Sequence, residues 1–217
     1  MNIFVQNFKN KKKLLFIIIS LLLFIFLIPF LIPLKADGKN KIQLTPKAVK
    51  GVINFNSNSL YKKDSIEVKG DWDFYKNQFL KPDDIANNQI PKKSGTLYFP
   101  GTANQFPVKK GSKEKIGPFI YGSFLLKVSG IKNNFPFSFE ISGVSSNFDL
   151  TIIQGQEIFP MGGYGIIGTN ERKSISQFGK LLGDFTSNGN DFYILIRASN
   201  YHYRGLGILS YFKIGPR

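Results

Sequence analysis

The stretch DFYILIRASNYHYRGLG, residues Asp191–Gly207, decides the fold. Its first part, residues 192–196, is apolar at every position, which is typical of a strand that is covered on both faces. The part that follows is polar and ends in glycines. A strand of this kind near the end of the chain predicts the centre of a β-sandwich, with a polar cluster where the strand ends.

The polar part carries the candidate ligand-binding side chains, which are Asn200, Tyr201, His202, Tyr203 and Arg204. In an extended backbone, the amide, imidazole and guanidinium groups project to one face and the two phenols to the other. His202 is the only histidine in the sequence. Such a set of donors and acceptors can hold a polar ligand. The alternative is structural, with the same side chains bracing a turn that ends in the glycines of residues 205–207.

Length and composition restrict the classes of protein. With 217 residues, the chain accommodates one domain and a targeting segment, and its 22 Phe residues are enough for a packed core. Cysteine is absent, which excludes disulfides, thiolate metal ligands, cysteine nucleophiles and a lipid-modified cysteine. We predict no cofactor and no metal site, although calcium held by carbonyl and carboxylate oxygens cannot be recognised from sequence.

The N-terminal segment predicts the compartment. Four lysines within residues 9–13 precede the apolar run Leu14–Leu34, whose 21 residues span about 31 Å as a helix. This length matches the roughly 30 Å hydrocarbon core of a bilayer. The lysines predict that residues 1–13 are cytoplasmic and that the rest faces outward. No small-residue cleavage pattern follows, so we expect an uncleaved anchor rather than a signal peptide, and then a polar linker, residues 35–59.

The net charge of +15 needs a separate explanation. Without the five lysines of residues 1–36, the chain carries 24 basic and 14 acidic residues, a net charge of +10. Such a charge is typical of proteins that bind nucleic acid. A domain outside the cytoplasm argues against that partner. We therefore expect solvated lysines, or attraction to anionic lipid headgroups or acidic glycans, and no nucleic acid.

The middle of the chain predicts many short strands. Alternating or apolar runs, separated by turn residues, occur at 52–55, 65–70, 97–100, 121–128, 135–141, 148–153, 157–159 and 206–214. Pro82, followed by two aspartates, predicts a capped turn or a brief helix. No amphipathic helix longer than two turns and no internal repeat is evident. This pattern predicts an all-β fold, a sandwich or jelly roll, over residues 60–215.

Two motifs resemble catalytic ones by their letters alone. GYGIIG, residues 163–168, matches the glycine fingerprint of dinucleotide-binding proteins. It is not followed by a helix and has no βαβ unit around it, so we interpret its glycines as places where the loop bends or approaches another backbone. A serine triad would have to use His202, but no G-x-S-x-G elbow is present.

The run DWDF carries a possible carboxylate pair. In a strand, Trp72 and Phe74 share one face, which we expect to be buried, and Asp71 and Asp73 share the other. Two carboxylates on one face are what glycoside hydrolysis requires, and Glu140 is a third acid candidate. A solvated strand edge explains the aspartates equally well. We predict no catalytic residues.

Seven runs occur in a specific order: WDFY (72–75), QFLKP (78–82), FPGTAN (99–104), YGSFLLKV (121–128), ISGVSSNFDL (141–150), GTNERKSISQF (168–178) and ASNYHYRGLG (198–207). As a set, they resemble the extracytoplasmic galactose-binding-like jelly roll of bacterial seven-transmembrane receptors with diverse intracellular signalling modules. The resemblance covers about residues 60–214. The hairpin in the fifth run is also similar to the sugar-binding, non-catalytic jelly roll of β-galactosidase-type glycosidases.

The resemblance implies a sensor module at the bacterial cytoplasmic membrane that faces the periplasm or the exterior. In relatives, this module is coupled to kinase, cyclase, phosphatase or diguanylate cyclase output. The chain stops at Arg217, where those receptors continue into seven membrane helices, so we expect a short standalone member or a truncated reading frame. Residues 153–155, Ile-Gln-Gly, also replace the aromatic residue and Asn-Gly of many relatives, which changes the expected ligand contacts.

We therefore expect a membrane-anchored, outward-facing jelly roll that binds a small polar ligand, such as a carbohydrate, or a membrane signalling partner. Asn147 of the hairpin joins the predicted ligand-binding residues. Arg204 needs a carboxylate or a ligand oxygen as a partner, because an unpaired buried guanidinium is costly, and Asp149 and Asp73 are the protein-side candidates. Two other classes stay open: an enzyme that acts on glycans, and a structural envelope protein without a ligand.

Overall fold

The computed structural model describes residues 46–55, 65–102, 113, 115–117, 119–144, 146–203 and 207–217. All of them belong to one compact unit, residues 44–217. The predicted anchor Leu14–Leu34, the segment 1–13 and most of the predicted linker lie outside the described residues. Among the residues described, no helix is long and apolar enough to cross a membrane.

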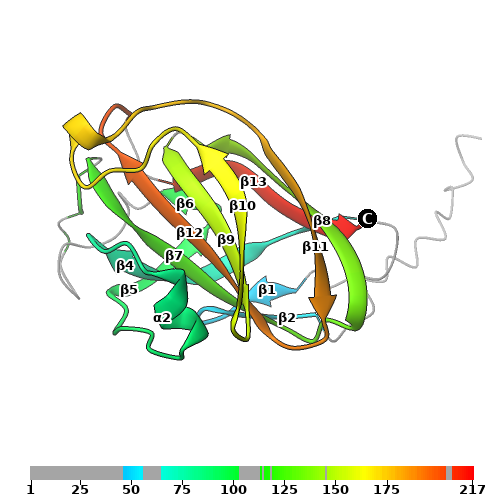
Figure 1. Ribbon diagram of the computed structural model, residues 1–217. Helices are drawn as coiled ribbons and strands as arrows, with labels where there is room; N and C mark the ends of the chain where they lie inside the picture. The colour runs from blue at the N-terminus through cyan, green and yellow to red at the C-terminus, as the bar shows by residue number, and fades with distance from the viewer. Residues whose placement is uncertain are drawn as a thin grey trace, which may run out of the picture. The chain divides into compact units, whose positions relative to one another are not determined.

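The described chain consists mainly of strands (Figure 1). In chain order the elements are β1 (Lys47–Ala48), β2 (Val52–Asn54), β3 (Ile66–Glu67), β4 (Lys69–Lys76), α2 (Pro82–Ala86), β5 (Gly95–Phe99), β6 (Gly101–Thr102), β7 (Ile120–Ser129), β8 (Asn133–Val144), β9 (Asn147–Gln154), β10 (Glu157–Tyr164), η2 (Glu171–Lys173), β11 (Leu181–Asn188), β12 (Phe192–Asn200) and β13 (Gly207–Pro216). Each strand run predicted from the sequence overlaps at least one of these strands, whereas β11 corresponds to no predicted run.

The strands form two sheets that pack face to face (Figure 1). Sheet A has eight strands in the order β1-β4-β7-β12-β9-β10, with β2 beside β7 and β5 beside β4. Sheet B has five, in the order β11-β8-β13-β3, with β6 beside β13. From β7 onward, the chain changes sheet at every connection except the β9–β10 hairpin, a winding typical of jelly rolls. The predicted all-β sandwich is confirmed.

Aromatic rings fill the space between the two sheets. Trp72 of β4 is fully buried. Its ring stacks on Phe99 with 4.4 Å between centroids, and it lies 6.0 Å from Phe212 of the opposite sheet. Phe74 is also fully buried in this core. The prediction that Trp72 and Phe74 face inward is therefore confirmed.

Strand β12 lies in the interior of sheet A, between β7 and β9. Phe192, Ile194 and Ile196 point into the core between the sheets. Leu195 points to the outer face and is nevertheless fully buried, because it belongs to a second apolar cluster there. The predicted covering of this strand on both faces is confirmed.

A short segment covers part of the outer face of sheet A. This strap, residues 77–90, follows β4 and contains α2, whose first turn holds Pro82 and two aspartates as the sequence predicted. Leu80 and Ile85 of the strap are buried and pack in the second apolar cluster, together with Tyr75 and Leu195 of the sheet. The strap therefore leaves only part of the outer face open to solvent.

Candidate functional site

The polar stretch after β12 does not continue as a strand. Strand β12 ends at Asn200, and residues 201–203 form bends. The Asn200 side chain is buried. Its Nδ2 donates to the Tyr203 carbonyl at 2.6 Å, and its Oδ1 accepts from the Tyr203 N–H at 3.0 Å. The predicted alternation of side chains over residues 200–203 is therefore wrong, and Asn200 braces a turn.

The other predicted residues of this stretch differ in exposure. His202 is exposed, whereas Tyr201 and Tyr203 are partly buried. The Tyr203 ring packs on Phe178, with 4.8 Å between centroids. Partial burial raises the pKa of Tyr201. Arg204 lies outside the described residues. As ligand contacts, His202 and the two tyrosines stay predictions.

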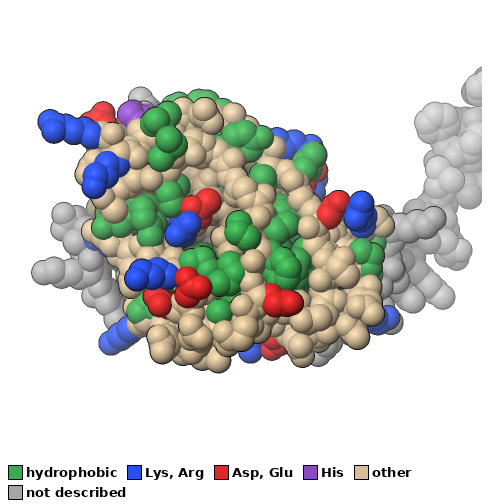
Figure 2. Space-filling view, viewed as in Figure 1, with side chains coloured by type: hydrophobic (Ala, Val, Ile, Leu, Met, Phe, Trp, Pro, Cys, Tyr) green, Lys and Arg blue, Asp and Glu red, His purple; other side chains and the backbone are tan. Residues whose placement is uncertain are grey.

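A charged pair that the sequence analysis did not find lies on the outer face of sheet A. Arg197 of β12 and Asp149 of β9 are register partners. The Arg197 Nε donates to Asp149 Oδ1 and its Nη2 to Oδ2, both at 2.8 Å. These two parallel bonds form a fork, the strongest arrangement for this pair of groups. Figure 2 shows basic and acidic side chains side by side near the middle of this face.

This pair changes the expected partner of Arg204. Asp149, one of the two carboxylates proposed for Arg204, binds Arg197 with both oxygens. The other, Asp73, accepts a hydrogen bond from Lys93 Nζ at 2.6 Å. Both carboxylates therefore have a cation partner within the described part of the chain.

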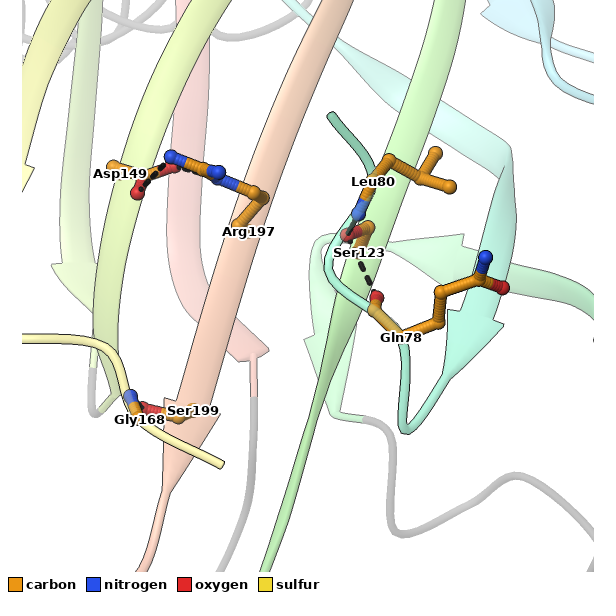
Figure 3. A network of polar contacts seen from close by, with 7 residues as sticks. All are labelled: Gln78, Leu80, Ser123, Asp149, Gly168, Arg197 and Ser199. Carbon is orange, nitrogen blue, oxygen red and sulfur yellow. Dashed lines mark hydrogen bonds and ion pairs between the residues drawn. The ribbon is translucent and has the colours of Figure 1, made fainter. Parts of the chain in front are cut away.

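The strap borders the pair on the side of β7 (Figure 3). Ser123 of β7 stands opposite Arg197 in the sheet and is fully buried. Its hydroxyl accepts from the Leu80 N–H at 2.9 Å and donates to the Gln78 carbonyl at 2.9 Å. One serine side chain thus binds two backbone polar groups of the strap where the strap crosses the sheet.

A loop rich in glycine and serine borders the pair at the end of β12. This glycine loop, residues 165–180, lies over Ser199, whose Oγ accepts from the Gly168 N–H at 3.1 Å (Figure 3). Asn147 is buried beneath the loop and donates from Nδ2 to Ser174 Oγ at 2.5 Å. No described residue donates to Asn147 Oδ1. Asn147, predicted as a ligand contact, thus holds the loop.

The glycines of residues 163–168 allow close approach of backbones. A Cβ atom on Gly163 would lie 1.9 Å from the Phe148 carbonyl oxygen, and one on Gly165 would lie 2.3 Å from the Ile175 carbonyl oxygen. This result confirms the interpretation of the glycine motif. Gly163 is the register partner of Asp149, so β10 places no side chain over the charged pair at this position.

The charged pair therefore lies in a window in the covered face. We use the name window for the partly exposed Arg197–Asp149 pair between the strap, the glycine loop and Gly163. The two side chains are 28% and 30% exposed, whereas Ser123 on the adjacent strand is fully buried. A guanidinium has five donors and a carboxylate about four acceptor sites, so a fixed pair offers both kinds of group to a ligand.

Aromatic side chains lie beside the window. Tyr121 of β7 is partly buried, and its ring lies 4.9 Å from that of Phe79 in the strap. The Tyr121 phenol also adds to the raised pKa of Tyr201, because the two groups are neighbours. Tyr201, a residue that the sequence predicted as a ligand contact, thus borders this region.

A hollow of about 240 Å³ lies near the other end of the same face. It is lined by α2, the β9–β10 turn, and the side chains of Lys127 and Tyr193. Lys127 Nζ lies 3.0 Å from Asp191 Oδ2, and this hydrogen bond raises the pKa of Lys127. Gln156 Nε2 donates to the Ala86 carbonyl at 2.9 Å. Three of the polar side chains that line this hollow, Lys127, Asp191 and Gln156, therefore already have partners within it.

The three acid candidates do not converge. Asp71 and Asp73 lie on β4 of sheet A, and Glu140 lies on β8 of sheet B. Glu140 binds Lys180 at 2.8 Å and accepts from the Tyr211 hydroxyl, and the hydrogen bond from Lys180 is the main reason that its pKa is lowered. Within the part of the chain that the structure describes, no three Asp, Glu or His side chains gather as a metal site requires.

Comparison with known proteins finds distant structural neighbours only. No family model matches the chain, and no curated protein matches it. Among solved structures, a GH2 β-galacturonidase from Eisenbergiella tayi bound to galacturonate is 11% identical with a TM-score of 0.43, over 70% of this chain and 24% of that one. The β-glucuronidase of Ruminococcus gnavus is 10% identical with a TM-score of 0.45, over 70% and 28%. That of Faecalibacterium prausnitzii is 10% identical with a TM-score of 0.44, over 64% and 22%.

The aligned region spans about a quarter of the length of these neighbours. Similarities this low assign neither a family nor an activity to the chain.

Proposed function

We propose that the chain is a non-catalytic binding module that holds a small hydroxylated ligand, such as a sugar, in the window on sheet A. The Arg197–Asp149 pair is the observation that carries this proposal. Its side chains are partly exposed and fixed by two hydrogen bonds of 2.8 Å, on a face whose neighbouring positions are covered. Few, well-placed polar groups beside apolar surface are the usual composition of a ligand site.

The chemistry of the window favours hydroxyl groups over a single charge. The two charges of the pair compensate each other, so neither a strong anion nor a strong cation gains from the site as a whole. Adjacent hydroxyls of a sugar can donate to Asp149 and accept from Arg197 at the same time. Tyr121 and Phe79 provide an apolar surface nearby for the C–H face of a sugar ring.

Arg197→Lys should weaken ligand binding by about 10- to 100-fold, because lysine keeps the charge but loses the fork, and hydrogen bonds to charged groups are worth about 1.5–3 kcal/mol. The measurement is a calorimetric screen of the purified chain against neutral hexoses, amino sugars, uronic acids and fragments of envelope glycans, followed by titration of the hit.

Asp73→Asn is the matched control. It removes another ion pair of the same sheet, with Lys93, outside the window. We expect this variant to bind as the wild type does. Unchanged affinity in Arg197→Lys, with the fold intact by circular dichroism, would place the ligand elsewhere. If no compound of the screen binds the wild type, the proposal of a sugar module fails.

We also infer that the module faces outward from a bacterial cytoplasmic membrane and senses its ligand for a membrane signalling partner. The lysines ahead of Leu14–Leu34, the length of that run and the ordered resemblance to receptor sensor domains support this inference.

The anchor should stay attached to the mature protein. N-terminal sequencing of the protein extracted from membranes identifies its first residue. A mature protein that begins near Asp37 would contradict an uncleaved anchor.

A further inference from the structure

The glycine loop carries large apolar side chains on its exposed surface. Ile166, Ile175 and Phe178 are 54%, 53% and 63% exposed. Ile166 and Ile175 are partners in an antiparallel bridge, so their side chains lie on the same face of the loop. Exposed apolar groups that gather on one segment mark a contact with a partner or a membrane.

Part of the backbone of this loop is already paired, around the bridge and η2. Ile166 N–H donates to the Ile175 carbonyl at 2.9 Å, and Ile175 N–H donates to the Ile166 carbonyl at 3.0 Å. The N–H groups of Lys173 and Ser174 donate to the carbonyls of Asn170 and Glu171. Unpaired backbone N–H and C=O groups are costly in an apolar medium. Since the backbone groups of the bridge are paired, the two isoleucines can enter the apolar part of a membrane. The pairing also leaves the bridge without free groups for strand addition by a partner protein.

The loop is braced from below, so its apolar side chains cannot easily turn inward. Its anchors are the bonds from Gly168 to Ser199 and from Asn147 to Ser174 described above. At its far end, the Tyr164 hydroxyl donates to the Lys180 carbonyl at 2.7 Å. A fixed loop presents Ile166, Ile175 and Phe178 to the outside at little entropic cost.

Basic side chains accompany the apolar ones. Arg172 and Lys173 of η2 are exposed between the two isoleucines in sequence, next to one acid, Glu171. In Figure 2, blue and green side chains lie together at the upper left, the corner that η2 occupies in Figure 1. Phe178 packs against Tyr203 with the two rings tilted by 58°, and tyrosine is enriched at the membrane interface. Apolar side chains flanked by cations complement an anionic lipid surface.

We propose that the glycine loop docks on the surface of an anionic lipid bilayer. Ile166, Ile175 and Phe178 enter the boundary between headgroups and acyl chains, and Arg172 and Lys173 bind lipid phosphates. This inference rests on the loop alone and holds for an anchored or an unanchored chain. Because the same loop borders the window, docking would also fix the orientation of the ligand site relative to the membrane.

The test uses single cysteines in the full chain, which has none of its own. Ile175→Cys and Phe178→Cys are each labelled with an environment-sensitive nitrobenzoxadiazole dye and reconstituted with vesicles of phosphatidylglycerol and phosphatidylcholine, or of phosphatidylcholine alone. Leu182→Cys is the matched control, because Leu182 is 62% exposed but lies on β11 of sheet B. Dye emission and quenching by aqueous iodide are measured.

We expect a blue shift and protection from iodide at positions 175 and 178 on anionic vesicles, and neither at position 182. Arg172→Gln and Lys173→Gln should each reduce the docked-to-undocked ratio about fivefold on anionic vesicles. Dye at 175 and 178 that stays open to iodide on anionic vesicles would overturn the proposal. So would protection that needs an added membrane protein fraction, which would make the partner a protein.

Discussion

Trp72→Ala should lower the free energy of unfolding by about 3–5 kcal/mol, the range for large-to-small substitutions of buried aromatic residues. The indole is fully buried, stacks on Phe99 at 4.4 Å and lies 6.0 Å from Phe212. It therefore links both sheets of the sandwich, and alanine would leave a cavity at the centre of the core. The measurement is guanidinium denaturation followed by far-ultraviolet circular dichroism, because the variant has no tryptophan left to report by fluorescence.

Tyr98→Ala is the control for loss of an aromatic side chain. Tyr98 lies on β5, beside β4, and is 52% exposed. Its removal should change stability by no more than about 0.5 kcal/mol, as for most surface positions. A Trp72→Ala variant as stable as Tyr98→Ala would mean that the sandwich core does not depend on the indole.

Local patterns predicted the fold well because they describe single strands. The apolar run at residues 192–196 has no polar face, and only an inner strand with two covered faces tolerates that. Gly155 lies between the predicted runs 148–153 and 157–159, in a turn where its φ of 61° is one that glycine adopts without strain. The glycine motif matches the dinucleotide fingerprint only in its letters, because the fingerprint requires a helix that does not follow these glycines.

The candidate site was missed because it depends on register. Arg197 and Asp149 are 48 residues apart, and they meet only because β12 and β9 pair in one particular register. A one-residue slip would put them on opposite faces. In the sequence, each of the two residues is a single charge within a strand pattern, and nothing nearby indicates its partner. The alternation of side chains along β12 could have indicated the face of Arg197, because residues 195 and 197 point to the same side of the sheet.

The cluster at residues 200–204 was predicted from local spacing alone, and that spacing did not show where the strand ends. Alternating polar and aromatic residues fit an extended strand, and they fit a turn held by a side chain just as well. Asn200 resolves the ambiguity with its two bonds to the backbone of Tyr203, three residues on. Asparagine readily replaces strand hydrogen bonds with local ones of this kind. Period-2 spacing therefore cannot locate the end of a strand in such a sequence.

One buried hydroxyl binds two backbone groups of the strap, so Ser123→Ala should destabilise the protein by about 2–3 kcal/mol. The substitution removes the acceptor of the Leu80 N–H and the donor to the Gln78 carbonyl, and a buried polar group left unpaired costs about 1–3 kcal/mol. Ser138→Ala is the control, because its exposed hydroxyl binds Asp184 on sheet B, and we expect it to cost less than about 1 kcal/mol. Denaturant melts compare the two.

Tyr75 reports whether Ser123 acts through the strap. Burial raises the pKa of Tyr75 to about 12, above its ordinary value near 10. Between these values the unfolded chain gives up a proton that the folded chain keeps, so this contribution to stability is complete below about pH 10 and is lost as the pH rises through about 12. In Ser123→Ala the loosened strap should expose the phenol and lower its pKa toward 10. Phenolate absorbance, corrected with Tyr75→Phe, measures the change, and an unmoved pKa in a destabilised Ser123→Ala variant would show that the serine supports the sheet rather than the strap.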